Sequence, residues 1–336
     1  RGPRVRIVSL LPSATEIIGR LGAAADLVGR SHECDHPAGL GSLPVLTSQR
    51  TSTDISPGTS PGTSADIDEQ VRTARAAGEP LYILDTDRLL ELKPDVIITQ
   101  DLCDVCSVDL GTVRRAADEI ERSTGTRPEV VSLNPETVED VIDDVLTVGR
   151  AIGREREAFD AVVDLRGRFH TAQEFVNPYE EGPVVGFMEW TDPIFIAGHW
   201  TVQLIERAGG RHPLNETVAK PGTGMAVGPQ QGERVAGKSV RVPSEAFAAT
   251  RPEFLVIAPC GFDLAQTRAA ADELRGREWF ESLPAVRNGR VALVDGNQHF
   301  NRPGPRLAEA FEFLVGFIQQ RPGLIPEGFA WEPLDA

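Results

Sequence analysis

Cysteine is scarce in this sequence, with only four among its 336 residues. So few cysteines in a chain of this length exclude a disulfide scaffold, and reduced thiols, one or two bridges, or metal ligands remain open. Basic residues are also in deficit, because 34 lysines and arginines stand against 50 aspartates and glutamates, a net charge of −16. A strongly acidic chain binds polyanions poorly, so we expect no nucleic-acid partner.

Long apolar runs are absent as well. No stretch approaches the roughly 20 apolar residues that a membrane-spanning helix needs, so we expect no transmembrane segment. Hydrophobic residues make up 40% of the chain and charged residues 25%, which excludes a wholly disordered protein. At roughly 100–200 residues per domain, the length favours two domains or lobes. The sequence begins at Arg1, so the residues that precede it decide between a signal peptide and a cytoplasmic start.

Strand and helix patterns alternate in the first half. The apolar run 5–11 is rich in β-branched residues and predicts a strand, and 14–21 predicts a helix that follows it. Ser13 and Glu16 have the spacing of a capping box at the start of this helix. A second strand is predicted at 27–30.

The rest of the first half contains one loop and two further strands. The segment 47–66 is rich in Ser, Thr, Pro and Gly and predicts a mobile surface loop. A short helix at 87–92 leads into a strand at 95–99, and another strand is predicted at 130–133.

A long helical pattern follows, because apolar residues repeat at helical spacing from residue 136 onward. A continuous helix over 136–176 would be about 60 Å long at 1.5 Å per residue, more than one small domain needs. We therefore interpret it as a helix that joins two lobes. Gly149 and Gly153 would weaken this helix or divide it into two.

The second half repeats the order of the first. The matched blocks are strand 184–187, a loop and helix 200–208 against 5–22; residues 244–258 against 87–99; and strand 291–294 with helix 305–319 against 130–150. The spacing also agrees, since seven residues separate Asp87 from Pro94 and Glu245 from Pro252. The repeat predicts two similar α/β lobes. They would span 5–135 and 180–318, with 319–336 as a C-terminal tail.

Ligands of open α/β sheets bind beyond the carboxyl ends of the strands. The residues that follow the predicted strands are therefore candidates for lining a ligand cleft, and they include all four cysteines and three histidines. The candidates are Ser13, His32, Glu33, Cys34, Gln100, Cys103, Cys106, Glu189, Trp190, His199, Trp200, Cys260, Phe262, His299, Phe300 and Arg302.

Cys103 and Cys106 form a C-x-x-C pair, a spacing that suits a metal or a redox pair. No second C-x-x-C and no H-x-x-x-H motif accompanies it, so no standard zinc module is encoded. Four-thiolate coordination would need Cys34 and Cys260 to converge on the pair, and His32 is a further candidate metal ligand. The other interpretation is two thiols in a partly buried loop.

The polar segment 31–37 (SHECDHP) also admits a Cys–His nucleophile pair, with Cys34 or Cys260 attacking. No nucleophile elbow of the form G-x-S-x-G supports this interpretation. The alternative is a polar turn whose side chains cap backbone groups.

Several segments together resemble one family, the cobalamin-type periplasmic-binding proteins. They are IVSLLPSATEIIGRL at 7–21, LVGRSHECDHP at 27–37, LKPDVII at 92–98, IFIAGHWTVQLIERAGG at 194–210 and RPGPRL at 302–307. The resemblance covers about residues 5–318. It implies the class III periplasmic-binding-protein fold, in which two similar Rossmann-like α/β lobes are joined by a long rigid backbone helix and hold the ligand in the cleft between them.

The resemblance also implies a function and partners. Members of this family are substrate-binding components of ABC importers for cobalamin and iron–siderophores, which implies a binding protein rather than an enzyme, a monomer, and a periplasmic or lipid-anchored location. In the family an acidic residue on each lobe docks to arginines of the membrane subunits, and Asp87 and Glu245 occupy the matched positions. The alternative is that each carboxylate only stabilises the first turn of its helix.

The chain departs from the family at two places. The segment 47–66 is an insertion, and a cysteine-rich rim with His32 and His299 replaces the usual aromatic corrin platform. The resemblance therefore implies a small molecule or metal chelate as ligand, cobalamin-like or siderophore-like, with a corrinoid, a chelate and a bound metal all open. The rival interpretations are a thiol- or metal-dependent enzyme and a cytoplasmic cofactor or metal sensor on the same fold.

Overall fold

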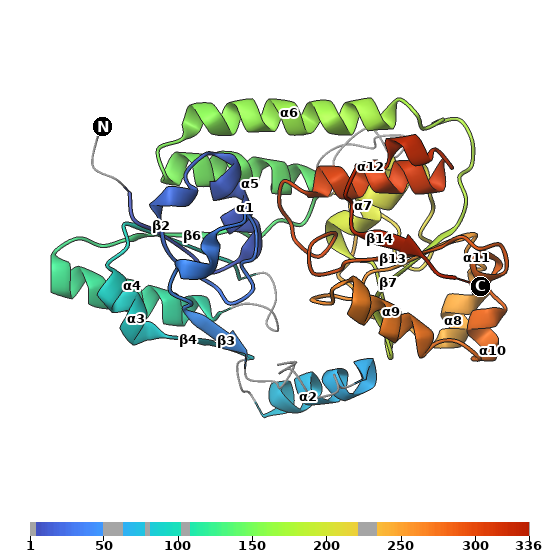
Figure 1. The fold of residues 1–336 in the computed structure, drawn as a ribbon, viewed down its shortest axis with the longest axis horizontal. Coiled ribbons are helices and arrows are strands. Elements are labelled where there is room, and N and C mark those ends of the chain that lie inside the picture. The colour runs from blue at the N-terminus through green and yellow to red at the C-terminus, as the bar shows by residue number, and fades with distance from the viewer. Residues whose placement is uncertain (1–4, 50–62, 78–80, 102–107, 221–233, 336) are drawn as a thin grey trace. The chain divides into compact units, whose positions relative to one another are not determined.

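The computed structural model of the protein describes residues 5–49, 63–77, 81–101, 108–220 and 234–335 (Figure 1). The chain divides into two compact units. The first unit comprises residues 1–62, 66–135 and 139–164, and the second comprises 63–65, 136–138 and 165–336. Each unit contains helices and a sheet with parallel strands, which confirms the two α/β lobes expected from the internal repeat.

The first unit is built on a four-stranded parallel sheet with strand order β2-β1-β5-β6. Its strands are β1 (Ile7–Ser9), β2 (Leu27–Arg30), β5 (Val96–Thr99) and β6 (Glu129–Ser132), and a separate antiparallel pair consists of β3 (Thr47–Gln49) and β4 (Tyr82–Leu84). Its helices are α1 (Pro12–Arg20), η1 (Ala24–Asp26), η2 (Leu40–Ser42), α3 (Thr86–Leu92), α4 (Leu110–Thr124) and most of α5 (Val138–Ala151). Like α5, whose first residue belongs to the second unit, two further helices belong partly to each unit: α2 (Ser64–Ala76) and α6 (Glu155–Gln173).

The second unit has a six-stranded sheet with strand order β11-β8-β7-β12-β13-β14, of which β7, β12 and β13 are parallel. The strands of this unit are β7 (Val185–Thr191), β8 (Ile194–Ile196), β11 (Val240–Arg241), β12 (Phe254–Ile257), β13 (Val291–Val294), β14 (Trp331–Pro333), and the pair β9 (Val218–Ala219) and β10 (Arg234–Val235). Its helices are α7 (His199–Arg207), α8 (Ser244–Ala249), α9 (Leu264–Asp272), α10 (Glu278–Glu281), α11 (Pro284–Arg287), α12 (Leu307–Ile318) and η3 (Pro322–Leu324).

Each unit has its own hydrophobic core. In the first unit, Val8 and Ile97 of the sheet pack with Val113 of α4, and all three side chains are buried. In the second unit, Leu255 and Leu293 of the sheet belong to a separate cluster. Burying one such side chain contributes about 1.5–3 kcal/mol, so both cores stabilise their sheets strongly.

The capping box predicted at the start of α1 is wrong. The helix begins at Pro12, its N-cap is Leu11, and no side chain caps it. Proline suits the first helical position because it has no N–H that needs an acceptor there. Ser13 and Glu16 are buried inside the helix rather than placed at its end.

The loop predicted after the strand at 184–187 is also wrong. β7 continues to Thr191, and β8 returns antiparallel to it. The pairing register shifts between Met188 and Trp190, which leaves Glu189 as the extra residue of a β-bulge. A bulge re-aims side chains, and this one lies at the carboxyl end of a central strand.

The helix predicted over 136–176 is two helices, α5 and α6, as its glycines allowed. Gly153 has φ 68, a left-handed conformation that ends a helix. Gly149 lets the two helices approach, because a Cβ at this position would lie 2.3 Å from Cβ of Ala158. Helix α6 then crosses from the first unit, which ends at Asp164, into the second.

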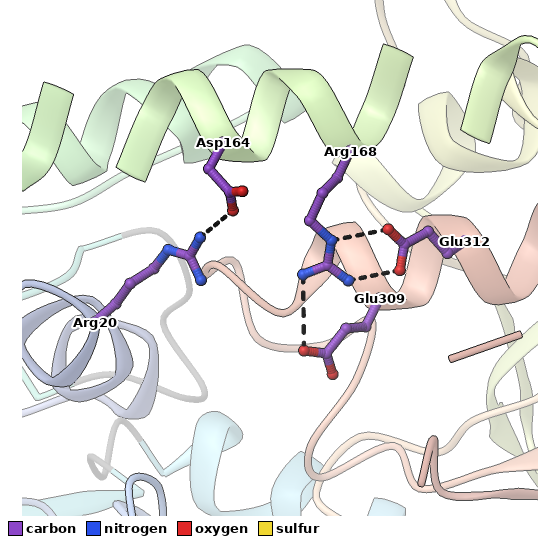
Figure 2. Close-up of polar contacts among 5 residues, drawn as sticks. All are labelled: Arg20, Asp164, Arg168, Glu309 and Glu312. Atoms are coloured by element: carbon purple, nitrogen blue, oxygen red, sulfur yellow. Dashed lines mark hydrogen bonds and ion pairs between the residues drawn. The ribbon is translucent and has the colours of Figure 1, made fainter. Parts of the chain in front are cut away.

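Ion pairs hold α6 to each unit separately (Figure 2). In the first unit, Arg20 of α1 donates to Asp164. In the second, Arg168 donates from Nε to Oε1 of Glu312 on α12 at 2.8 Å, and from Nη2 to Oε2 at 2.5 Å. Glu309 lies 4.0 Å from the same guanidinium. Bidentate pairing of this kind is strong and oriented, so α6 has a fixed place on α12.

Two segments predicted to be irregular contain regular structure. The loop 47–66 begins with β3 and ends with the start of α2, and residues 50–62 lie outside the described residues. The segment 319–336, predicted as a tail, contributes β14 to the edge of the second sheet. Across the described chain, every helix is too short or too polar to span a bilayer.

Candidate functional site

In the first unit, Cys34 lies among hydroxyl groups at the carboxyl ends of β1 and β2. Its Sγ is 2.9 Å from Oγ1 of Thr15 and 3.5 Å from Oγ of Ser31. Thr15 Oγ1 in turn donates to Oγ of Ser9 at 2.8 Å. Cys34 is only 2% exposed, so this thiol packs beneath the surface.

The neighbouring His32 and Glu33 are partly exposed and lie beside the strand pair β3–β4. His32 Nδ1 is 2.7 Å from Oγ1 of Thr47, which also accepts the backbone N–H of His32 at 3.0 Å. The imidazole lies 5.2 Å from the ring of Tyr82, whose hydroxyl donates to Oε1 of Glu33 at 2.5 Å. These side chains form a polar and aromatic cluster beyond the carboxyl end of β2. Gln100 follows β5 and is also partly exposed.

Sequence reasoning did not single out Tyr82. Tyr82 lies on β4, a strand of three residues that the sequence pattern did not reveal. Its hydroxyl donates a hydrogen bond to Glu33. One signal was available, because the chain contains only two tyrosines. A rare aromatic residue beside a turn signal deserved consideration as a ligand contact.

In the second unit, Glu189 is placed by the β7 bulge against the start of α7. Its Oε1 accepts the backbone N–H of Gly198 at 3.1 Å, and the Ser239 hydroxyl also bonds to it. Burial raises the pKa of the Glu189 carboxyl to about 7, although these two hydrogen bonds act in the opposite direction. The residue keeps a partly exposed surface, but its carboxyl group is enclosed.

His199 begins α7 with a left-handed backbone, φ 48, and its N–H donates to the carbonyl of Gly237 at 2.9 Å. Burial lowers the pKa of its imidazole; nearby Glu136 opposes this shift and Lys238 adds to it. The neutral ring is partly exposed and stacks on Trp200 at 5.6 Å. Trp200 itself is buried and donates its indole N–H to the carbonyl of Phe300 at 2.7 Å.

An aromatic pair lies where β7 and β12 end. The rings of Trp190 and Phe262 are 4.9 Å apart, and both residues are partly exposed. Cys260 is exposed, and its backbone N–H donates to the carbonyl of Glu189 at 3.1 Å. The carboxyl ends of neighbouring strands therefore bring Glu189, Trp190, Cys260 and Phe262 together, as the sequence predicted for one lobe.

The loop after β13 carries two arginines. Arg302 is 6% exposed and donates to Oδ1 of Asn297 at 2.9 Å. His299 is buried, and its Nδ1 has no hydrogen-bond partner among the described residues. Burial lowers the pKa of His299 to about 3, and the positive charges of Arg306 and Arg302 contribute to the shift. Phe300 beside it is fully buried and packs against Phe187, so it belongs to the core.

The predicted metal ligands are not assembled within the described residues. No three His, Cys, Asp or Glu side chains in that part of the chain are placed to hold one metal ion. Cys103 and Cys106 lie outside it, whereas Cys34 belongs to the first unit and Cys260 to the second. A shared cysteine site with His32 therefore stays a prediction.

The predicted docking residues, Asp87 and Glu245, are exposed in the first turns of α3 and α8. The cap of α3 is Asp85, which accepts the backbone N–H of Arg88 at 3.0 Å. Considering only described residues, neither Asp87 nor Glu245 forms a hydrogen bond or ion pair. Both carboxylates are thus available to a partner.

Known structures resemble the whole chain. A periplasmic heme binding protein from Pseudomonas aeruginosa is 20% identical, with a TM-score of 0.64 over 98% of this chain and 95% of that one. A periplasmic vitamin B12 binding protein of Vibrio cholerae is 18% identical, with a TM-score of 0.62 over 95% and 99%. The periplasmic heme-binding protein from Roseiflexus sp. RS-1 is 19% identical, with a TM-score of 0.62 over 94% and 98%. No curated protein matches the chain by sequence.

The family comparison agrees with these fold similarities and with the resemblance noted in the sequence. The family model described as periplasmic binding protein matches residues 7–297, which include the sheets of both units except β14. The chain therefore belongs to the periplasmic binding protein family.

Proposed function

We propose that the protein is the substrate-binding component of an ABC importer and that it carries a metal chelate, such as a heme, a corrinoid or a ferric siderophore. One observation carries the proposal: a binding-protein family model spans residues 7–297, and binders of heme and vitamin B12 share the fold over nearly the full chain. The same relationship supports a location outside the cytoplasm, in a periplasm or on a lipid anchor.

The second unit suits a flat ligand with acidic substituents. Trp190, Phe262 and His199 offer partly exposed rings on which a macrocycle can stack. Arg302 and Arg306 place two guanidinium groups in the loop after β13, although the chain as a whole is strongly acidic. Guanidinium groups recognise carboxylates and phosphates by paired hydrogen bonds, which favours a chelate with such groups.

In the first unit we assign His32, Glu33 and Tyr82 to the ligand, since they form a partly exposed cluster beyond the carboxyl end of β2. Gln100, Cys103 and Cys106 remain proposed contributors from sequence. Ser13, Cys34, Trp200 and Phe300 are buried and would support the site from beneath.

We propose binding without catalysis. A thiol nucleophile must be accessible to its substrate and have a base beside it. Cys34, the first candidate, is 2% exposed and packs on the hydroxyls of Thr15 and Ser31. This environment supports a packing role for the thiol.

We also propose that Asp87 and Glu245 meet arginines of the importer's membrane subunits. Both carboxylates are exposed, and the cap of α3 is provided by Asp85 instead. Free carboxylates at matched positions of the two units are suited to bidentate pairing with guanidinium groups.

Titration of the purified protein with hemin, cyanocobalamin and a ferric hydroxamate siderophore tests the proposal. We expect at least one of them to bind with a Kd of about 1 μM or below. Arg302→Gln should weaken that binding about tenfold, because a charge-assisted pair is lost. Arg122→Gln, an exposed arginine of α4 paired with Glu119, serves as the matched control.

A Kd above about 100 μM for all three chelates would contradict the proposal. Equal affinities of the parent, Arg302→Gln and Arg122→Gln proteins would remove Arg302 from the site. Melting temperatures of both variants show whether a loss of binding follows from a loss of folding.

A further inference from the structure

The first residue of α2 is held by the carboxyl end of β7. Ser64 is only 2% exposed, and its Oγ lies 2.8 Å from Oγ1 of Thr191. Its backbone carbonyl accepts the indole N–H of Trp190 at 3.0 Å. The hydroxyl and the backbone carbonyl of one serine are therefore bound to two successive residues of β7.

The rest of α2 is held weakly. Ser64 is the one buried residue among the described side chains of this helix, and the others are exposed or partly exposed. A helix of 13 residues is marginal in water unless it buries an apolar face. Its position therefore depends strongly on the contacts of Ser64, and segments with so little burial open readily.

The position of Ser64 matters because Trp190 belongs to the aromatic pair assigned above to the ligand. An indole has a single hydrogen-bond donor, and here that donor is bound to Ser64. Ser64 and its two neighbours, Thr63–Ala65, group with the second unit, whereas the remainder of α2 groups with the first. They also lie at the end of the segment 47–66, the insertion relative to the family.

We propose that Thr63–Ala65 act as a strap, which holds the indole N–H of Trp190 in the ligand-free protein and is released when the ligand takes its place. This inference rests on the proposed binding function. Release requires only that two hydrogen bonds break and one small side chain leaves its pocket, so a ligand that stacks on the pair can displace the strap. The strap thus lowers the apparent affinity for ligands that must displace it to engage Trp190.

The hydroxyl pair between Ser64 and Thr191 gives the test in the ligand-free protein. Ser64→Ala and Thr191→Val each delete one hydroxyl with little change in volume. We expect backbone amides 66–76 to exchange hydrogen about fivefold faster in both variants, the factor for one net hydrogen bond. Ser123→Ala on α4, whose hydroxyl donates to the Ile120 carbonyl at 2.9 Å, should leave this exchange unchanged.

Acrylamide quenching gives a second readout of the same event. The fluorescence of Trp190 is obtained as the difference between a protein and its Trp190→Phe variant. In Ser64→Ala, acrylamide should quench this fluorescence more strongly than in the parent, because the indole is more accessible. Unchanged exchange in α2 together with unchanged quenching would overturn the strap.

Ligand titration tests the release. Saturating hemin or cyanocobalamin should speed exchange in α2 of the parent, and Ser64→Ala should bind the effective probe about fivefold more tightly. Slower exchange in α2 on binding, or weaker binding by Ser64→Ala, would make this segment a wall of the site and overturn the strap. If neither these two probes nor the ferric siderophore binds, the proposed ligand class fails, whereas exchange and quenching in the free protein still decide the strap.

Discussion

Helix α1 of the first unit and helix α7 of the second match each other down to their ends. α1 and α7 each have nine residues, each follow an extended N-cap residue with no side-chain cap, and each end at a glycine in the left-handed conformation. The glycines are Gly22, with φ 71, and Gly209, with φ 85. The backbone N–H of Gly22 donates to the carbonyl of Gly19, and that of Gly209 donates to the carbonyl of Glu206. Such a bond back to the last turn is a common way to close a helix.

A second match is rarer. Lys93 and Arg251 each have a positive φ, 44 and 51, directly before a proline and a central strand. Residues other than glycine seldom adopt this conformation. Its recurrence at the same point of both units indicates that they have the same backbone conformation there, although this conformation is unfavourable for lysine and arginine.

The chemistry at the strand ends differs, however. The first unit places a buried thiol and several hydroxyls there, as at Cys34 and Thr15. The second unit places aromatic rings and arginines there, as at Trp190 and Arg302. The same fold in both units therefore does not determine the chemistry of a site, because the side chains that follow the strands can vary without changing the fold.

The largest predicted effect breaks the match between the two helix ends. Gly22→Ala and Gly209→Ala each force alanine into a left-handed conformation, which costs about 1–2 kcal/mol of unfolding free energy. At Gly22 nothing lies within 4 Å of the added Cβ, but at Gly209 it would be 2.8 Å from Cγ1 of Val176 and from Nε2 of Gln319. We expect Gly209→Ala to cost about 1–3 kcal/mol more than Gly22→Ala in urea unfolding.

Relief of the crowding at Gly209 is restricted. Gln319 can swing away only by breaking the hydrogen bond that its Nε2 donates to the carbonyl of Ala208 at 2.9 Å. The double variant Gly209→Ala with Val176→Ala separates crowding from backbone strain. Equal losses for Gly22→Ala and Gly209→Ala would show that the second unit repacks freely.

The match between units explains what could be predicted from sequence. β13 lies at 291–294 as predicted, and α7 and α12 are within two residues of their predicted starts and ends, because periodic apolar residues report local structure. β8 and β14 could not be found in this way. Each has three residues and exists because a partner strand offers hydrogen bonds, which sequence spacing does not reveal.

The candidate site also has features that the sequence predicts and features that it does not. Position after a strand placed Trp190, Phe262 and Cys260 at the correct end of the sheet. It did not tell which residues point into the protein, and Phe300 is fully buried. Ser64 was missed, because a serine in a segment without apolar residues carries no local signal of burial.

The next prediction compares the response of the two units to pH. His299 in the second unit has an imidazole pKa of about 3, because burial and two arginines disfavour its charged form. The unfolded chain takes up this proton near pH 6.5, so folding loses stability as the pH falls below that value. By pH 5 the loss is about 2 kcal/mol relative to His299→Gln, as measured by urea unfolding between pH 5 and 8.

Asp144 in the first unit should act in the opposite direction. Burial, followed by the charges of Asp140 and Asp143, raises the pKa of its carboxyl to about 7. The folded state holds this proton more tightly than the unfolded state, so the stability it contributes below about pH 4 is lost as the pH rises to 7. Relative to Asp144→Asn, the parent should become less stable over this interval. Parallel pH profiles of the parent and the variant would contradict the assignment.

The smallest predicted effect separates helix capping from partner docking. Asp85→Ala removes the cap of α3 and should cost about 1 kcal/mol, whereas Asp87→Ala with Glu245→Ala should cost less than about 0.5 kcal/mol, since neither carboxylate is bonded within the described chain. The double variant should nevertheless reduce transport by membrane vesicles that contain the cognate permease, with chelate affinity unchanged. Because the interaction is between exposed charges, it is screened less at low salt. The difference in transport between the parent and the double variant should therefore grow as the salt concentration is lowered. A double variant that melts lower than Asp85→Ala but supports full transport would assign Asp87 and Glu245 to helix stability and remove them from the docking surface.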